Sequence, residues 1–180
     1  MIRILTDSAA DLTPADRARP GVTVVPLQVV FSNGDTALDG VDITGDAYYE
    51  RLKGEEKLPR TSQPSPDQFI EGLAQARAAG DQVGAVLLSS TLSGTWQCAR
   101  LAAETCEFED LWVVDSRTGS QGEAVLVREA LRLRDEQGCT AEQIAAALEE
   151  LKGRIRILGV VDSLKHLHKG GRLPAAVALV

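Results

Sequence analysis

Hydroxyl side chains gather directly after an apolar run in the middle of the chain. The run Val83–Leu88 is followed by Ser89–Thr91 and, one leucine later, by Ser93, Gly94 and Thr95. A short apolar run bounded by turn residues predicts a buried strand, and the residues after Thr95 favour a helix with Ser93 as its N-cap. Free backbone N–H groups and the positive end of the helix dipole would make this loop a site for an anion such as phosphate or carboxylate.

A second hydroxyl pair, Thr61 and Ser62, precedes another predicted helix start. Ser65 and Gln68 fit a capping box with Pro66 at the first helical position. Thr61 and Ser62 would therefore lie in a loop at a helix N-terminus. Neutral donors from two such loops can hold a carboxylate without a buried countercharge. The alternative is that Thr61, Ser62 and Ser93 are simple helix caps, which leaves backbone donors free as well.

The residues that other known functions of a strand–loop–helix unit require are missing here. The loop has no lysine, so the phosphate clamp of a P-loop is missing, and no G-x-G-x-x-G follows the apolar strands. Serine hydrolysis is the enzyme alternative, with Ser93 as nucleophile on a strand-to-helix turn. The G-x-S-x-G pattern is absent, and His166 and His168 are the only candidate bases.

The charge balance argues against a nucleic-acid partner. The net charge is −7 and the pI is about 4.9, whereas nucleic-acid binding relies on Lys and Arg. The charge is uneven, because residues 151–180 hold six basic residues and one acidic residue, so this end could bind an anionic ligand or partner. Three widely spaced cysteines and two histidines form no convincing zinc pattern, and we expect neither a metal nor a cofactor.

The cellular location is predicted from what the chain lacks. No signal peptide precedes the first apolar run, and no run is long enough to span a bilayer. The cysteines have no evident pairing, which suits free thiols in a reducing compartment. We therefore expect a soluble cytoplasmic protein without integral membrane contact.

Strand and helix patterns alternate along the chain, which predicts an α/β fold with an open, mostly parallel sheet and helices on both faces. The predicted strands are 2–5, 22–25, 27–31, 83–88, 111–114 and 155–161. The predicted helices are 14–19, 45–52, one from 66, one from the Ser93 loop to 106, 122–137, and one from 141 to about 151. Pro26 suggests an edge or a bend between the second and third strands.

Four predicted strands end in similar polar pairs, namely Asp7-Ser8, Ser89-Ser90, Asp115-Ser116 and Asp162-Ser163. Ligands of open α/β sheets bind beyond the carboxyl ends of the strands, so these pairs mark one rim of the sheet as the site. Asp and Ser are also common helix caps and turn formers, which is the alternative for any single pair.

Several motifs, in order along the whole chain, together resemble the DegV family of fatty-acid-binding proteins, the lipid-carrying subunits of bacterial fatty acid kinase. They are 7–12 (DSAADL), 25–27 (VPL), 39–44 (DGVDIT), 61–65 (TSQPS), 92–95 (LSGT), 114–116 (VDS) and 169–172 (KGGR). The resemblance implies a DegV-type α/β domain over 1–163, with 164–180 beginning the connection into a smaller second domain. We expect that domain to be missing, because the apolar run 173–180 ends the sequence without a polar cap.

The resemblance also implies a ligand and a partner. Thr61 and Ser93 would hydrogen-bond the carboxylate of one long-chain fatty acid such as palmitate, with Ser62, Gly94 and Thr95 as neighbouring contacts. The acyl chain would run into an apolar tunnel. A separate ATP-binding fatty acid kinase subunit would phosphorylate the bound carboxylate for phospholipid metabolism, so the chain would be a carrier without catalytic residues.

Overall fold

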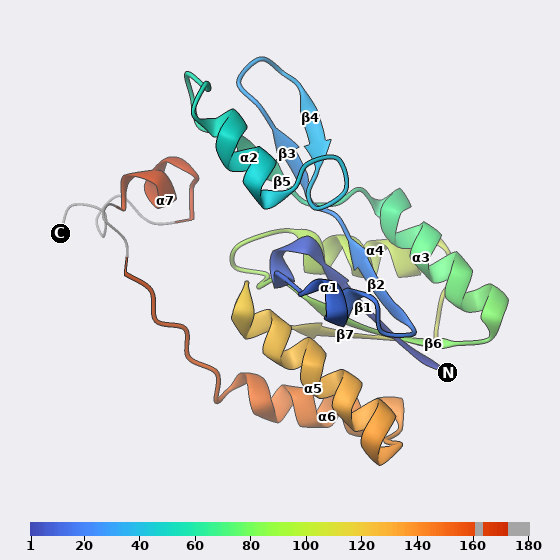
Figure 1. Ribbon diagram of the computed structural model, residues 1–180. Helices are drawn as coiled ribbons and strands as arrows, with labels where there is room; N and C mark the ends of the chain where they lie inside the picture. The colour runs from blue at the N-terminus through green and yellow to red at the C-terminus, as the bar shows by residue number, and fades with distance from the viewer. Residues whose placement is uncertain (161–163, 173–180) are drawn as a thin grey trace.

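The structure, a computed structural model, describes residues 1–160 and 164–172. Its centre is a parallel sheet of four strands in the order β2-β1-β6-β7, with helices on both faces (Figure 1). The strands are β1 (Ile2–Asp7), β2 (Val22–Val25), β6 (Gln82–Leu87) and β7 (Leu111–Asp115). The predicted α/β fold with an open, mostly parallel sheet is confirmed, and β2 is an edge strand as the proline after it suggests.

One face of the sheet is covered by α5 (Gln121–Gln137) and α6 (Ala141–Lys152). Ile4, Val86 and Val114 point to this face and are buried against these helices. Thr140 begins α6 with the predicted capping box, because its hydroxyl accepts the Gln143 N–H while its own N–H donates to the Gln143 amide.

The opposite face is covered by α3 (Pro66–Ala79) and α4 (Thr95–Thr105). Leu5, Ala85 and Leu87 point to this side and belong to the same buried cluster as Phe69, Leu73, Ala99 and Ala102. Adjacent strand residues thus face opposite layers, and both layers are apolar, as a parallel sheet covered on both sides requires. Two short helices follow β1, namely η1 (Ser8–Ala10) and α1 (Pro14–Arg17).

A second, antiparallel sheet of three strands was only partly expected. It has the order β4-β3-β5 and is built from β3 (Gln28–Val30), β4 (Thr36–Leu38) and β5 (Arg60–Ser62), beside α2 (Gly45–Leu52). β3 lies within a predicted strand, but β4 and β5 are only three residues long each and carry no strand pattern of their own, and β5 is polar and exposed. A small buried cluster of Val29, Phe31 and Ile43 supports this sheet.

The predicted last strand, 155–161, is wrong for its described part, because residues 155–160 pair with no strand. The topology supplies a reason. α4 joins β6 to β7 on one face, whereas α5 and α6 follow β7 on the other face. A further parallel strand outside β7 would need a left-handed crossover, which protein folds avoid. Residue 161, the predicted Asp162-Ser163 strand end and the apolar run 173–180 lie outside the described residues.

The described chain closes with α7 (Lys165–Lys169), which lies on the same side of Figure 1 as α2. Within residues 1–160 and 164–172, no helix combines the length and the apolar character that a membrane crossing requires.

Candidate functional site

The carboxyl ends of β1, β6 and β7 form the predicted rim, and the first polar pair on it supports backbone groups. Asp7 is fully buried and accepts two N–H groups, those of Leu88 and Ala9, each over 2.9 Å. The hydroxyl oxygen of Ser8 accepts the Leu27 N–H over 3.0 Å. The Asp7 side chain therefore caps η1 through the Ala9 N–H, as the alternative interpretation has it, whereas the bonds to Leu88 and Leu27 tie the end of β1 to distant segments.

The polar ends of β6 and β7 hold each other. The Ser90 hydroxyl donates to Asp115 over 2.6 Å, and the Ser90 and Arg117 N–H groups donate to the same carboxylate. Burial acts to raise the pKa of Asp115, but these hydrogen bonds hold it below its usual range. The Ser89 N–H bonds to the Thr118 carbonyl over 2.9 Å. These groups fix the loops of the rim, and ligand donors must come from other side chains.

α4 begins at Thr95, and its N-cap is Gly94. The prediction that Ser93 caps this helix is wrong by one residue, because the Ser93 N–H still bonds within the preceding turn. The Ser93 oxygen lies 2.8 Å from the Thr95 hydroxyl oxygen and accepts the Thr95 N–H over 3.4 Å. The Gly94, Trp96 and Gln97 N–H groups bond to no acceptor in the described part of the chain, so the helix start offers free donors at the positive end of its dipole.

The five predicted contact residues differ in how accessible they are. Thr61, Ser62 and Gly94 are exposed, Ser93 is half-buried, and Thr95 is fully buried. The accessible residues can meet a ligand directly, whereas Thr95 reaches one only through its bond to Ser93.

Thr61 and Ser62 lie in a strand, which corrects their predicted placement in a loop. Thr61 stands opposite Val29 in the antiparallel pair of β5 with β3. The Ser62 hydroxyl donates to the Gln28 side-chain oxygen over 3.2 Å. Among the residues the structure describes, none bonds to the Thr61 hydroxyl, so it remains available for a ligand.

Two contacts join the segment after β5 to the start of α4. The Gln63 amide packs on Gly94 so closely that a Cβ at position 94 would lie 1.9 Å from its oxygen. The Cys98 thiol donates to the Pro64 carbonyl over 3.3 Å. Burial raises the pKa of this thiol, while the Gln63 side chain acts in the opposite direction. Because Thr61 is two residues from Gln63, its Cα lies within about 7 Å of the Gln63 Cα. The structure thus brings the two hydroxyl segments together.

Sequence reasoning missed Gln63 as the link, although it lies inside the 61–65 motif. The signal was a glycine at a helix start, which indicates that another group approaches the backbone closely. The structure also places Arg172 here, with its Nε 3.4 Å from the Leu92 carbonyl oxygen. The last residue of the KGGR motif therefore lies against the loop that carries Ser93.

The serine-hydrolase alternative gains no support from the described residues. The Ser93 side chain bonds to Thr95 alone, so no general base contacts it there. The side chain of His166 lies outside the description. Also within the described ranges, no three His, Cys, Asp or Glu side chains come together as a metal site would require.

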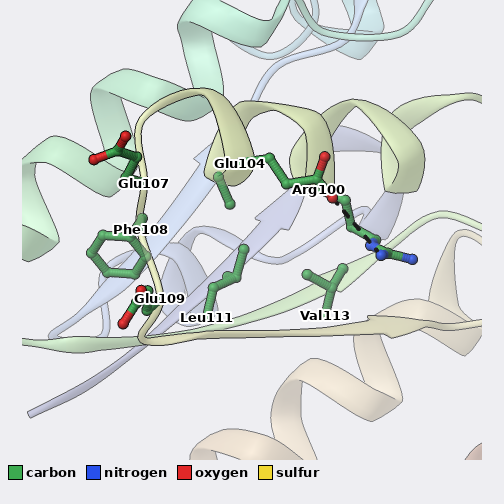
Figure 2. A pocket seen from close by; sticks show the side chains of 8 residues that line it. Arg100, Glu104, Glu107, Phe108, Glu109, Leu111 and Val113 are labelled. Atoms are coloured by element: carbon green, nitrogen blue, oxygen red, sulfur yellow. Dashed lines mark ion pairs between the residues drawn. The ribbon is translucent and has the colours of Figure 1, made fainter.

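Two cavities of about 280 Å³ each lie elsewhere, near the end of α4 and the start of β7. Figure 2 shows the first, with Phe108, Leu111 and Val113 among acidic side chains, and its lining also includes Arg100 and Ala103. The acidic lining residues are Glu104, Glu107 and Glu109. These acids disfavour a carboxylate ligand, and none of the five predicted contact residues lines either cavity.

Comparisons with known proteins give one consistent result. The model of the DegV family matches residues 1–180. A DegV domain-containing protein of Halalkalibacterium halodurans is 41% identical over 99% of this chain and 63% of its own length. Two solved structures also match, and this chain spans 63% of each.

The first is a DegV family protein from Thermus thermophilus, described as binding fatty acid, with 36% identity, a TM-score of 0.88 and coverage of 99% of this chain. The second is a stearic acid-binding protein from Eubacterium ventriosum, with 32% identity, a TM-score of 0.87 and coverage of 98%. The family model spans the whole chain, and the motifs at 61–65, 92–95 and 169–172 lie in neighbouring segments of the structure. The chain therefore belongs to the DegV family.

Proposed function

We propose that this chain binds a long-chain fatty acid by its carboxylate, with Thr61 and Ser93 as the hydroxyl donors. The observation that carries the proposal is the contact of Gln63 with Gly94, because it holds the segment bearing Thr61 against the helix start bearing Ser93. The fatty-acid-binding relatives from Thermus thermophilus and Eubacterium ventriosum support the same ligand class.

The hydrogen-bond donors at this site are neutral, which suits a ligand with a single negative charge such as a carboxylate. The Thr61 hydroxyl is exposed, and the free N–H groups of Gly94 and Trp96 add neutral donors at the start of α4. Hydrogen bonds to a carboxylate are roughly twice as strong as those between neutral groups. Ser62 and Gly94 would complete the contact, while the buried Thr95 orients the Ser93 hydroxyl.

Arg172 would supply the positive charge. Its guanidinium already lies against the Leu92 carbonyl, one residue before Ser93. The sequence left open whether the KGGR motif docks a partner or joins the lipid site. The Leu92 contact favours the lipid site for Arg172, whereas the exposed Lys169 is left for docking.

The chain would act as a carrier without catalytic residues or a cofactor. The acyl chain would occupy an apolar tunnel, part of which the family resemblance places in a second domain. A separate ATP-binding fatty acid kinase subunit would receive the exposed carboxylate and convert it to an acyl phosphate. This fits a rim of polar residues that are engaged in structure rather than in proton transfer.

The first test is the bound lipid itself. We expect organic extraction of the purified protein, followed by mass analysis, to release a long-chain fatty acid. Palmitate or oleate added to delipidated protein should bind with a stoichiometry of one per chain. Absence of a co-purifying acid, together with no binding of either added acid, would reject the proposal.

Removing one hydroxyl at a time locates the carboxylate. Thr61→Ala and Ser93→Ala should each lower palmitate affinity by about 1.5–3 kcal/mol, because each removes a hydrogen bond to a charged group. Thr105→Ala is the matched control, since that hydroxyl bonds to the Leu101 carbonyl at the far end of α4. Isothermal titration calorimetry measures the effect, and unchanged affinity in both site variants would place the carboxylate elsewhere.

A further inference from the structure

Two buried carboxyl groups at the rim play no part in the proposed lipid site. Asp7 ends β1, and Glu123 lies in the first turn of α5. Neither side chain is exposed to solvent. Burial of a charged carboxylate is unfavourable in free energy unless hydrogen bonds or an opposite charge compensate it.

Asp7 has its partners. One carboxylate oxygen accepts the Leu88 N–H and the other accepts the Ala9 N–H, each over 2.9 Å. Both oxygens are therefore used as acceptors, and an anionic carboxylate suits this role best. The bond to Leu88 fixes the start of the loop whose later turn carries Ser93.

Glu123 lacks a full set of partners. One of its oxygens accepts the Thr6 hydroxyl over 3.0 Å, while the other is buried without a hydrogen-bond partner among the described residues. The charges acting on the two groups are all acidic: Asp7 and Asp11 act to raise the pKa of Glu123, and Asp39 acts to raise the pKa of Asp7. The Asp7 N–H acts in the opposite direction on Glu123. An ionised Glu123 would thus be an unpaired buried charge beside Asp7.

The pKa values of Glu123 and Asp7 differ because their hydrogen-bond partners differ. Burial, and then the charge of Asp7, raises the pKa of Glu123 to about 10. Burial raises the pKa of Asp7 only to about 6, because the Leu88 and Ala9 N–H groups favour its anion. At neutral pH Glu123 is therefore neutral and Asp7 is charged.

We propose that the Asp7–Glu123 pair holds a single proton on Glu123, and that Asp7, kept as an anion by this arrangement, is the positioning residue for the Ser93 loop. The proposal rests on the role proposed above for Ser93. Its consequence is a pH limit: when Asp7 takes up a proton, one of its acceptor oxygens becomes an O–H group and its hold on the Leu88 N–H weakens.

The test follows the Leu88 amide by ¹H–¹⁵N NMR in the ligand-free full chain between about pH 5 and pH 8. In the wild type we expect one step in its chemical shift, centred near the Asp7 pKa of about 6. Asp7→Asn should abolish the step. Asp115→Asn is the matched control, because it loosens Ser90 on the same rim and should leave the step at Leu88 in place.

Glu123→Gln decides where the proton lies and also covers the case in which Asp7→Asn fails to fold. Glutamine is neutral, so the midpoint should stay within about 0.5 pH unit of the wild type if Glu123 is already protonated. A fall of about one unit or more would show that Glu123 is charged in the wild type and would overturn the proposal. A step that persists in Asp7→Asn would overturn it as well.

Palmitate binding at pH 7.5 tests the positioning role. Asp7→Asn should lose about tenfold or more in affinity, and Glu123→Gln should stay within about threefold of the wild type. Wild-type affinity in a folded Asp7→Asn protein would overturn the positioning role. If no variant, including the wild type, binds palmitate, the proposed function fails, while the Leu88 titration still decides the location of the proton.

Discussion

At the scale of single residues, hydrogen-bond partners separate the side chains that build the rim from those that remain for a ligand. The side-chain oxygens of Asp7, Ser8 and Asp115 accept hydrogen bonds from backbone N–H or hydroxyl groups of the protein itself. Thr61 keeps an exposed hydroxyl without a partner in the described part of the protein. Residue type alone made all of these candidates for binding, and only their partners distinguish them.

Glu123 gives a prediction for stability against pH. Its pKa is raised from 4.5 to about 10 on folding, so between these values the folded state binds more protons than the unfolded state. The free energy of unfolding should therefore fall as pH rises through this window. Glutamine does not titrate, so the Glu123→Gln variant should not show this fall in the free energy of unfolding. The free energy of unfolding of the variant minus that of the wild type should therefore increase between pH 6 and pH 8 by up to about 1.4 kcal/mol per pH unit. Urea unfolding at the two pH values measures the difference.

Glu129→Gln is the control for this prediction. The hydrogen bond from Arg132 holds the pKa of Glu129 below its usual range, so the group is ionised in both states at these pH values. Its stability difference from the wild type should not change between pH 6 and pH 8. A pH-independent difference for Glu123→Gln as well would contradict a neutral Glu123.

At the scale of elements, the small antiparallel sheet matters because β5 carries Thr61. The pairing of β5 with β3 sets the position of Thr61, and the contact of Gln63 with Gly94 then sets the approach of this strand to α4. Three buried residues, Val29, Phe31 and Ile43, support the sheet. The position of Thr61 therefore depends on a core much smaller than that of the main sheet.

Phe31→Ala tests this dependence. Phe31 is buried, with the Arg51 guanidinium 3.5 Å from its ring centre, so truncation should cost about 3–5 kcal/mol in stability. Palmitate affinity should fall as well, although Phe31 is not among the proposed ligand contacts, because β5 loses its support. Denaturant unfolding and calorimetric titration of the folded variant measure the two effects.

Phe108→Ala is the matched control, because Phe108 is buried in the main core beside α4. It should lower stability by a comparable amount while palmitate affinity stays near the wild-type value. Equal losses of affinity in both variants would indicate a general effect of instability. Full affinity in Phe31→Ala would show that Thr61 is held without the small core.

At the scale of the whole molecule, the charge is distributed unevenly around the proposed ligand site. The net charge is −7, yet the segment around α7 is basic and contacts the Ser93 loop through Arg172. Such a patch beside the proposed carboxylate site would steer an acidic or ATP-bearing partner toward the ligand. The division of the chain at residue 163 and the tunnel in a second domain stay predictions.

Lys169→Glu tests the docking patch. The exposed Lys169 lies outside the proposed lipid contacts, so charge reversal should weaken the complex with the proposed kinase subunit by about 3- to 10-fold at low salt, with a smaller effect at high salt. Palmitate affinity should remain unchanged. Lys53→Glu, at the exposed residue that follows α2, is the control and should not affect the complex. Loss of palmitate binding in Lys169→Glu would instead place this residue in the lipid site.

Local patterns in the sequence determined the α/β alternation, the apolar strands of the main sheet, and the capping boxes at Ser65 and Thr140. These features depend on residues close together in the chain, where side-chain period and cap chemistry act directly. The family was also readable, because its motifs recur in order from Asp7 to Arg172.

Only the tertiary structure decided the features that depend on distant partners. β5 is a strand because β3 lies beside it, and residues 155–160 stay outside the main sheet because α5 and α6 cross the face opposite α4. Gln63 became a link through its contact with Gly94, a residue far from it in the chain. The raised pKa values of Asp7 and Glu123 likewise follow first from burial, which arises when β1 and α5 pack together.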